Sequence, residues 1–317
     1  MHALLPPTPH RLRCALHGHT HLSDGEPTPA GLLEHFARAG WDVVAITDHY
    51  HVTRAEHAAL VTLPATELSA RVASPAGECD VLAFGVEALD PELGNDYFPS
   101  LAACADWIVA AGGVAYLAHP SYSGLVPDDY LSAPALSGIE VYNAGSEVFH
   151  GSGLSTVHWD DLLYRGARPF GLACDDTHYA GQDSRLAWTT CLVAERSAAA
   201  MLEALRTGAF YASSGPELHE VVLRDDGKVE VGCSPAAAVT LRSGPWDGCR
   251  ANADPHSMCW RAQILERDPH GAIVRALLDA PEFHAYGRVE VLGAAGGVAW
   301  TNAFELPAPV ATEPTPA

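Results

Sequence analysis

Residues 12–25 of the chain read LRCALHGHTHLSDG. The apolar start of this stretch, 12–16, predicts a buried strand, and His17 and His19 follow directly after it. Alternate residues of an extended segment point to the same side, so these two imidazoles can bind one metal ion. Asp24, in the glycine turn that follows, adds a carboxylate. The stretch therefore predicts a metal site at the end of a first strand.

The pattern of an apolar run followed by a helix-like segment continues to about residue 205. The apolar runs are 12–16, 43–46, 60–64, 81–84, 114–118, 139–142, 170–174 and 190–193, and the helical segments include 30–39, 101–111, 155–164 and 198–206. Apolar strands that alternate with helices indicate a parallel sheet, and about seven of them favour a closed barrel. A doubly wound open sheet is the alternative.

The position of the polar residues favours the barrel. Six of them lie just beyond the carboxyl end of an apolar run: His17, His49, Glu67, His119, Asn143 and Asp176. Barrel enzymes assemble their active sites at that end of the strands. We therefore expect an α/β domain, a (β/α)7-type barrel with its site at the strand ends.

After residue 213 the alternation of apolar runs with helix-like segments ends. Short strands separated by turn residues are predicted at 218–223, 229–231, 239–241, 258–265, 273–278, 289–292 and 298–300. The expected domains are a hydrolase barrel over 1–212 and a small β-rich, sandwich-like accessory domain over 213–306. The final segment, 307–317, is rich in Pro, Ala and Thr and is expected to be disordered.

The formal net charge of −21 argues against a broad basic face. A long nucleic acid or a membrane is therefore not an expected partner, although bound cations could still create a local site for a small anion. The eight cysteines include no CxxC pair and lie mostly in apolar runs. With no secretory signal and no membrane-length apolar run visible, a cytoplasmic location is expected. The oligomeric state is left open.

The candidate ligands are imidazoles and carboxylates without thiolates. They are His17, His19, Asp24, His49, Glu67, His119, Asp176 and His178. This set suits zinc, manganese or iron, and magnesium fits it less well. Glu67 or Asp176 could bridge neighbouring ions with its two oxygens, so we expect two or three divalent metal ions.

In order and spacing, these motifs resemble those of the polymerase and histidinol phosphatase (PHP) superfamily of metal-dependent phosphoesterases. The matching motifs are His17-x-His19 with Ser23-Asp24-Gly25, Ile46-Thr47-Asp48-His49, Thr66-Glu67, Ala118-His119-Pro120 and Asp176-x-His178. Segments 210–216 and 300–302 more weakly resemble the end of two-domain PHP proteins with an appended β domain. The resemblance implies a distorted seven-stranded βα barrel in which metal-bound hydroxide attacks a phosphoester at a di- or trinuclear centre.

The resemblance also implies roles for individual residues. His17 and His19 resemble ligands of a first ion, Glu67 a bridge, and His119 a ligand of a second ion. Asp24, His49 and His178 resemble the set for a third ion, and Asp176 a first-ion ligand that could bridge. The chain departs from the family's Gly-Ser-Asp-x-His with Ala173-Cys174-Asp175-Asp176-Thr177-His178, which leaves the role of Asp175 open. For the second ligand of the second ion, Glu140, Asn143 and His150 remain alternatives.

The catalytic candidates are Asp24, Asp48, Asp176 and His178. Asp48 could be a ligand or could orient the neighbouring imidazole. The candidates for substrate binding are His21, Asn143, His150 and Arg185, because Arg185 could hold a phosphate through two hydrogen bonds.

The favoured hypothesis is hydrolysis of a small phosphate mono- or diester. A metal-activated hydroxide would supply the nucleophile, since no serine or cysteine nucleophile motif such as GxSxG is present. Hydrolysis of carboxyl or carbamate esters or amides is the alternative. A non-catalytic metal-binding or sensor protein is the third hypothesis.

Overall fold

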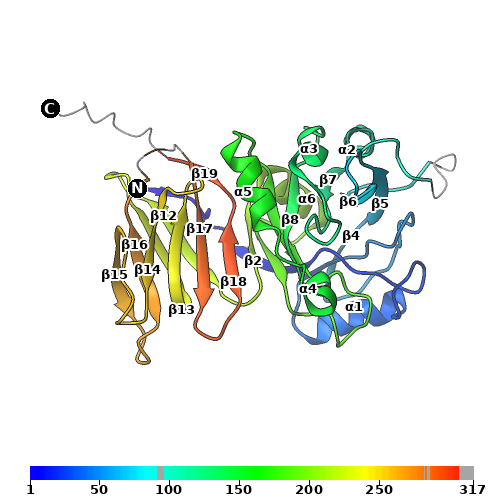
Figure 1. Cartoon of the computed structure of the whole chain (residues 1–317). Helices are drawn as coiled ribbons and strands as arrows, with labels where there is room; N and C mark the ends of the chain where they lie inside the picture. The colour runs from blue at the N-terminus through cyan, green and yellow to red at the C-terminus, as the bar shows by residue number, and fades with distance from the viewer. Residues whose placement is uncertain (91–95, 282, 284–285, 307–317) are drawn as a thin grey trace. The chain divides into compact units, whose positions relative to one another are not determined.

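Two units make up the chain in a computed structural model that describes residues 1–90, 96–281, 283 and 286–306. One unit is Pro7–Ser214, and the other joins Met1–Pro6 to the residues from Gly215 onward (Figure 1). The expected barrel domain, 1–212, therefore loses its first six residues to the second unit. These six residues belong to the second unit because strand β1 (His2–Ala3) pairs antiparallel with Val222 and Leu223. The predicted tail, 307–317, lies outside the described residues.

The strands of the unit Pro7–Ser214 form two mixed sheets. The first has the order β11-β10-β2-β3-β4, with β2 (His10–Ala15), β3 (Val43–Ala45), β4 (Val61–Leu63), β10 (Trp188–Val193) and β11 (Phe210–Ser213). The second has the order β5-β6-β7-β8-β9, with β5 (Ala65–Arg71), β6 (Glu78–Phe84), β7 (Val114–Leu117), β8 (Gly138–Asn143) and β9 (Phe170–Cys174). Two isolated parallel bridges, His49 with Glu67 and Gly18 with Thr177, connect residues of the two sheets.

The predicted parallel sheet is found only in part. Strands β2, β3 and β4 are parallel, as are β7, β8 and β9, but β6 runs antiparallel to both β5 and β7. Only residues 72–77 connect β5 to β6. A parallel connection needs a crossover of a dozen or more residues, so this short link forces a hairpin. The apolar-run pattern did not predict β5, which begins directly after Pro64.

Helices connect several of these strands. They are α1 (Pro29–Arg38), α2 (Leu101–Ala110), α3 (Pro127–Leu131), α4 (Ala144–His150), α5 (Thr156–Tyr164) and α6 (Ala198–Thr207). The side chains of Thr28, Ser100 and Ser197 each accept a hydrogen bond from a first-turn amide, which starts α1, α2 and α6. The sequence pattern predicted neither α3 nor α4. None of the helices in the described part of the chain is long and apolar enough to cross a membrane.

The second unit contains only strands among its described elements. Besides β1 they are β12 (Leu218–Leu223), β13 (Val229–Arg242), β14 (Gly248–Asn252), β15 (Ala262–Arg267), β16 (Ile273–Leu278), β17 (Tyr286–Gly293), β18 (Val298–Thr301) and β19 (Phe304–Glu305). The two strands predicted at 229–231 and 239–241 are one, β13. Its first part pairs with β12 and β16, and its last part pairs with β14 and β17. Register shifts near Gly232 and Ala236 separate the two parts.

Candidate metal centre

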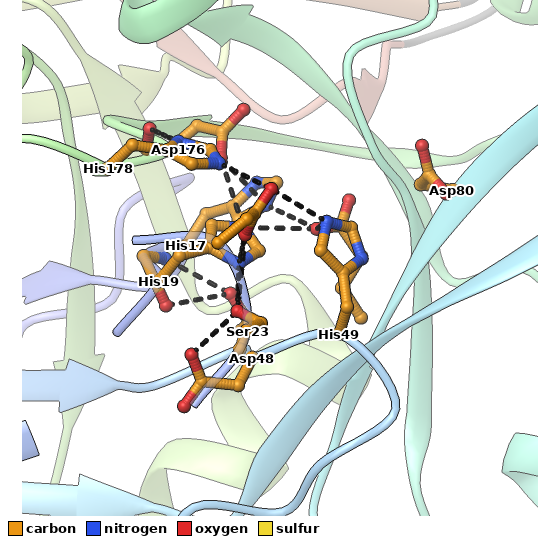
Figure 2. A network of polar contacts seen from close by, with 12 residues as sticks. His17, His19, Ser23, Asp48, His49, Asp80, Asp176 and His178 are labelled. Atoms are coloured by element: carbon orange, nitrogen blue, oxygen red, sulfur yellow. Dashed lines mark hydrogen bonds and ion pairs between the residues drawn. The ribbon is translucent and has the colours of Figure 1, made fainter. Parts of the chain in front are cut away.

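All eight predicted ligands lie close together at one end of the strands. Figure 2 shows His17, His19, His49, Asp176 and His178 among them. His17, His19 and Asp24 follow β2, His49 follows β3, Glu67 lies in β5, His119 follows β7, and Asp176 and His178 follow β9. Within each of five groups of three, one nitrogen or oxygen from each residue lies within 4.8 Å of the others. These groups are His17, His19, Glu67; His17, His119, Asp176; His19, Asp24, His49; His19, Asp176, His178; and Glu67, Asp80, His119.

Two buried carboxylates stand at the centre of this arrangement. The Nε2 atoms of His17 and His19 each lie 3.1 Å from Glu67 Oε2 and 3.2 Å from Asp176 Oδ1. His119 Nε2 lies 3.3 Å from the other oxygen of Glu67. His49 Nε2 lies 3.7 Å from Glu67 Oε2, so Glu67 faces four imidazoles, which is the position expected of a carboxylate that bridges cations.

A second, more exposed part of the cluster surrounds Asp24. Its Oδ2 lies 3.3 Å from His178 Nε2 and 3.7 Å from His49 Nε2. His19 connects the two parts, because its Nδ1 lies 3.3 Å from Asp24 Oδ1 while its Nε2 faces Glu67. The donor atoms thus extend from a buried inner group to an outer group that solvent can reach.

Four of the imidazoles share one orientation. Each holds its Nδ1 on an outer hydrogen-bond partner and turns its Nε2 toward the cluster. The four bonds join His17 to Glu140 at 2.8 Å, His19 to Ser23 at 3.3 Å, His119 to Ser123 at 3.1 Å, and His178 to the carbonyl of Asp176 at 3.0 Å. A proton on Nδ1 leaves a lone pair on Nε2, as metal-ligating histidines require.

Three atoms at the centre of the cluster lack hydrogen-bond partners, and this observation bears on whether a cation fits here. His19 Nε2, Glu67 Oε1 and Asp176 Oδ1 are buried and form no hydrogen bond with any described residue, although ion-pair distances surround them. Buried polar groups are normally satisfied by a hydrogen-bond partner or an ion. Divalent cations would satisfy all three atoms, and imidazoles with carboxylates suit zinc, manganese or iron. The residues therefore fit a divalent metal centre.

The backbone at two of these residues is unusual. His119 has a φ of 27° and Asp176 a φ of 58°, both in the left-handed region that side chains disfavour. Such conformations cost about 1–3 kcal/mol each and cluster at functional sites. Two of the candidate ligands are therefore held in strained backbone conformations.

The carboxylates also govern the protonation of the imidazoles. Burial lowers the pKa of His19, but the nearby carboxylates of Asp176 and Glu67 outweigh this effect and raise the pKa to about 10. Against the same effect of burial, Glu67 raises the pKa of His119 to about 9. Burial raises the pKa values of Glu67 and Asp176, but the charge of His17 and the other imidazoles outweighs it and lowers both. Cations must therefore displace protons from these rings.

Asp80 is a candidate ligand that the sequence analysis missed. It lies in β6, forms a group with Glu67 and His119, and lines the same cavity (Figure 2). The hydroxyl of Ser69 donates a hydrogen bond of 2.6 Å to its Oδ1. Because β6 runs antiparallel, its beginning meets the carboxyl ends of its neighbours. The sequence signal for Asp80 is its position directly before the apolar run 81–84, whereas the prediction considered only residues that follow such runs.

Two of the three residues proposed as the second ligand lie behind the ligands instead. Glu140 accepts hydrogen bonds from His17 Nδ1, the His119 amide at 2.9 Å and Asn143 Nδ2 at 2.9 Å. Asn143 Oδ1 accepts from the amide of Ser146 and so begins α4. Glu140 and Asn143 therefore position ligands, while His150, the third alternative, lines the cavity without joining a ligand group.

Asp48 is buried beneath the loop after β2 and does not line the cavity. It accepts hydrogen bonds from the amide and hydroxyl of Thr20 at 2.6 and 2.7 Å, the hydroxyl of Ser23 at 2.8 Å, and the hydroxyl of Thr53. These four donors occupy both of its oxygens. None of these bonds reaches an imidazole or the cavity, so the geometry favours neither expected role and points instead to Asp48 holding the loop after β2 in place.

Asp175 and Asp183 hold the loop that follows β9. Asp175 accepts from the amides of Arg185, Leu186 and Ala187 at 2.6–2.8 Å. Asp183 accepts from the amides of His178 and Tyr179 at 2.7–3.0 Å. Burial raises the pKa of Asp175 to about 7, against the opposing effect of its three amide donors. Asp175 is therefore a structural neighbour of the ligand Asp176.

Three of the four residues predicted to bind substrate do not line the cavity, and one of them, Asn143, is buried. His21 and Arg185 are exposed, and neither lines it. The cavity has a volume of about 210 Å3. Its lining consists of His19, Asp24, His49, Glu67, Asp80, His119, Tyr122, Gly145, Ser146, Phe149, His150, Asp176 and His178.

Comparison with known proteins identifies the fold. No protein-family profile and no curated protein matches the chain. A solved two-domain protein from Bacteroides vulgatus ATCC 8482, which contains a predicted PHP-like metal-dependent phosphoesterase, matches 96% of this chain and 98% of its own. The TM-score is 0.53 and the sequence identity 16%. The expected resemblance to a two-domain PHP-like protein is thus confirmed at the level of the fold.

Two partial matches are more distant. An amidohydrolase from Chromobacterium violaceum, with bound sulfate and no metal, matches 54% of this chain and 89% of its own at 18% identity and a TM-score of 0.40. A protein proposed to be a metal-dependent phosphoesterase, from Bifidobacterium adolescentis ATCC 15703, matches 53% of this chain and 88% of its own at 18% identity and a TM-score of 0.36. Both TM-scores are too low to add to the assignment.

Proposed function

We propose that the protein is a metal-dependent phosphoesterase that hydrolyses a small phosphate mono- or diester. The observation that carries this proposal is the shared orientation of four imidazoles, whose Nε2 atoms all face carboxylates of the cluster. The Nε2 atoms of His17, His19 and His119 face Glu67 or Asp176, and that of His178 faces Asp24. The Bacteroides vulgatus protein of the same fold contains a predicted phosphoesterase, which supports the choice of reaction.

In this proposal two or three cations bind in the cluster. His17, His19 and Asp176 would hold one ion, Glu67, His119 and Asp80 a second, and Asp24, His49 and His178 a third. Bound cations lower the pKa of water and stabilise negative charge on phosphoryl oxygens. The distorted barrel that the resemblance implies is part of this proposal, and the bridges of His49 with Glu67 and of Gly18 with Thr177 support it.

The residues of the chain have separate tasks. Glu140 keeps a proton on Nδ1 of His17, so that Nε2 remains a donor toward the cluster. Glu67 and Asp176 hold the inner imidazoles in place, and Asp24 orients His178 at the solvent side. The described cavity lining contains no lysine or arginine. A phosphoryl group in this cavity would therefore depend on the cations for charge neutralisation, which suits a multinuclear centre.

The proposed setting is the cytoplasm. All eight cysteines are free thiols, and seven of them are buried. Free buried thiols persist in a reducing compartment.

The direct test combines metal analysis with turnover. The protein would be freed of metal, reloaded with zinc, manganese or iron, and assayed for phosphate release from phosphomonoesters and for cleavage of phosphodiesters. We expect turnover that depends on metal and is lost in Glu67→Gln, while the exposed control Glu203→Gln keeps it. Hydrolysis of aryl esters or carbamates without hydrolysis of phosphoesters would replace the proposal. Tight metal binding without any turnover would indicate a metal-binding or sensor protein.

A further inference from the structure

One side of the cavity is bordered by aromatic rings. Tyr122 lies in the turn after His119, Phe149 and His150 end α4, and Tyr179 directly follows His178. All four rings are exposed, with 50% of Tyr122, 48% of Phe149 and 43% of Tyr179 accessible to solvent. Tyr122, Phe149 and His150 line the cavity itself.

These four side chains form a continuous series, called here the aromatic arc. Their ring centroids are 5.2 Å apart between Tyr122 and His150, 6.5 Å between His150 and Phe149, and 6.0 Å between Phe149 and Tyr179. Tyr122 also meets the ring of His119 edge-on at 5.3 Å. The arc therefore runs from one candidate metal ligand to the neighbour of another.

Packing within the fold does not account for the arc, because its rings remain largely open to solvent. Contiguous exposed apolar surface beside a cavity is typical of a ligand-binding site. The chemistry of this rim is also selective. It offers faces and edges of rings rather than the lysine or arginine side chains that would recognise a second phosphate.

We propose that the substrate is a phosphoester whose organic group is planar and aromatic, and that the aromatic arc binds this group while the phosphoryl group lies at the metal centre. The inference rests on the proposed function, because it assumes where the phosphoryl group binds. Aromatic pairs gain about 0.5–1.5 kcal/mol beyond the burial of their area when they stack offset or meet edge to face. An aliphatic ring of similar size gains only the burial.

This difference gives a test that does not require turnover. Phosphonates contain a carbon–phosphorus bond that phosphoesterases do not hydrolyse, so calorimetry can measure their binding to the metal-loaded protein. Phenylphosphonate and cyclohexylphosphonate carry rings of similar size, of which only the first is planar and aromatic. Butylphosphonate is the open-chain comparison. We expect phenylphosphonate to bind most tightly.

Variants connect that preference to the arc. In Tyr122→Leu and Phe149→Leu we expect the affinity for phenylphosphonate to fall about three- to tenfold and that for butylphosphonate to stay unchanged. Leucine keeps an apolar side chain, and both positions are exposed, so the fold should tolerate the changes. Tyr164→Leu is the matched control, because Tyr164 is 48% exposed on α5 and does not line the cavity.

The outcomes separate this inference from the proposed function. Equal or tighter binding of cyclohexylphosphonate, or no effect of either arc variant, would overturn the inference even if phosphoesters are hydrolysed. Failure of every phosphonate to bind would overturn it as well. A phenyl preference that both variants reduce supports it, and would do so even if the turnover assay failed.

Discussion

At the scale of single residues, the site separates groups that face the cavity from groups that hold them. Asp80 and Asp48 are both aspartates of the same region, yet only Asp80 joins a candidate ligand group. Asp48 is occupied by four donors within the protein. Residue type therefore cannot assign a role here, and the partners of each oxygen can.

Replacing Asp80 should remove one donor from the second cation. We expect Asp80→Asn to lower the metal content per chain without unfolding the protein, because an amide oxygen is a weaker ligand than a carboxylate for these ions. Metal analysis after dialysis against a weak chelator measures this, with circular dichroism as the check on folding. The exposed Asp106→Asn on α2 is the control. Unchanged metal content in Asp80→Asn would exclude Asp80 as a ligand.

Replacing Glu140 should weaken metal binding from behind the ligands. Glutamine cannot accept on both sides as Glu140 does, and its amide group would face a donor at one of the three bonds. Loss of such an orienting partner typically costs about 10–100-fold in metal affinity, and we expect a loss of that size in Glu140→Gln. Competition with a chromophoric chelator measures the affinity. An affinity equal to that of the control Glu203→Gln would contradict this role.

At the scale of elements, strand direction decides which residues meet. The ligands after β2, β3, β7 and β9 follow the strand-end pattern that parallel strands produce. The antiparallel strand β6 instead contributes from its beginning, which is why its aspartate was missed. The loop after β9 depends on a different device, the buried carboxylate of Asp175, which gathers three amides.

Loss of that carboxylate should loosen the loop more than the rest of the fold. In the wild type, three amides bond to the two carboxylate oxygens of Asp175. In Asp175→Asn only one acceptor oxygen remains for these three amides. We expect hydrogen exchange to become faster at the amides of residues 185–187, while β2 and β3 keep their protection. Mass spectrometry of exchanging peptides provides the measurement. Equal exchange in the variant and the wild type would show that other contacts hold the loop.

At the scale of the whole molecule, the candidate centre draws on distant parts of one unit. Every candidate ligand lies within Pro7–Ser214, from His17 after β2 to His178 after β9. The buried carboxylates of Glu67 and Asp176 face imidazoles there. Three atoms of this group, His19 Nε2, Glu67 Oε1 and Asp176 Oδ1, form no hydrogen bond within the described part of the chain. Cations that bind only the folded chain would therefore stabilise this unit directly.

Removal of metal should lower the thermal stability of the protein. A ligand present at 100 times its dissociation constant adds about 2.7 kcal/mol to the free energy of unfolding. We expect chelation to lower the unfolding temperature and readdition of zinc or manganese to restore it. Hydrogen exchange should localise the change to Pro7–Ser214 and leave the strands from β12 onward unaffected. A variant with His17→Ala and His19→Ala should lose the metal-dependent shift, and retention of the full shift would place the cations elsewhere.

Sequence periodicity predicts some elements of this fold and not others. Periodicity predicted most of the strands and four of the helices in the unit Pro7–Ser214, because apolar strands and amphipathic helices have distinct repeats. It could not predict β5, α3 or α4, and it divided β13 into two strands. Short elements carry too few residues for a period, and register shifts inside β13 interrupt its alternation.

The sequence alone determined the eight candidate ligands, because imidazoles and carboxylates after buried strands have few other reasons to recur in that order. Tertiary structure alone decided the remaining roles. It placed Asp80 among the candidate ligands, Glu140 and Asn143 behind them, and Arg185 away from the cavity. These distinctions depend on strand direction and on which atom each oxygen or nitrogen meets, and contacts between residues far apart in the chain are fixed only when the chain folds.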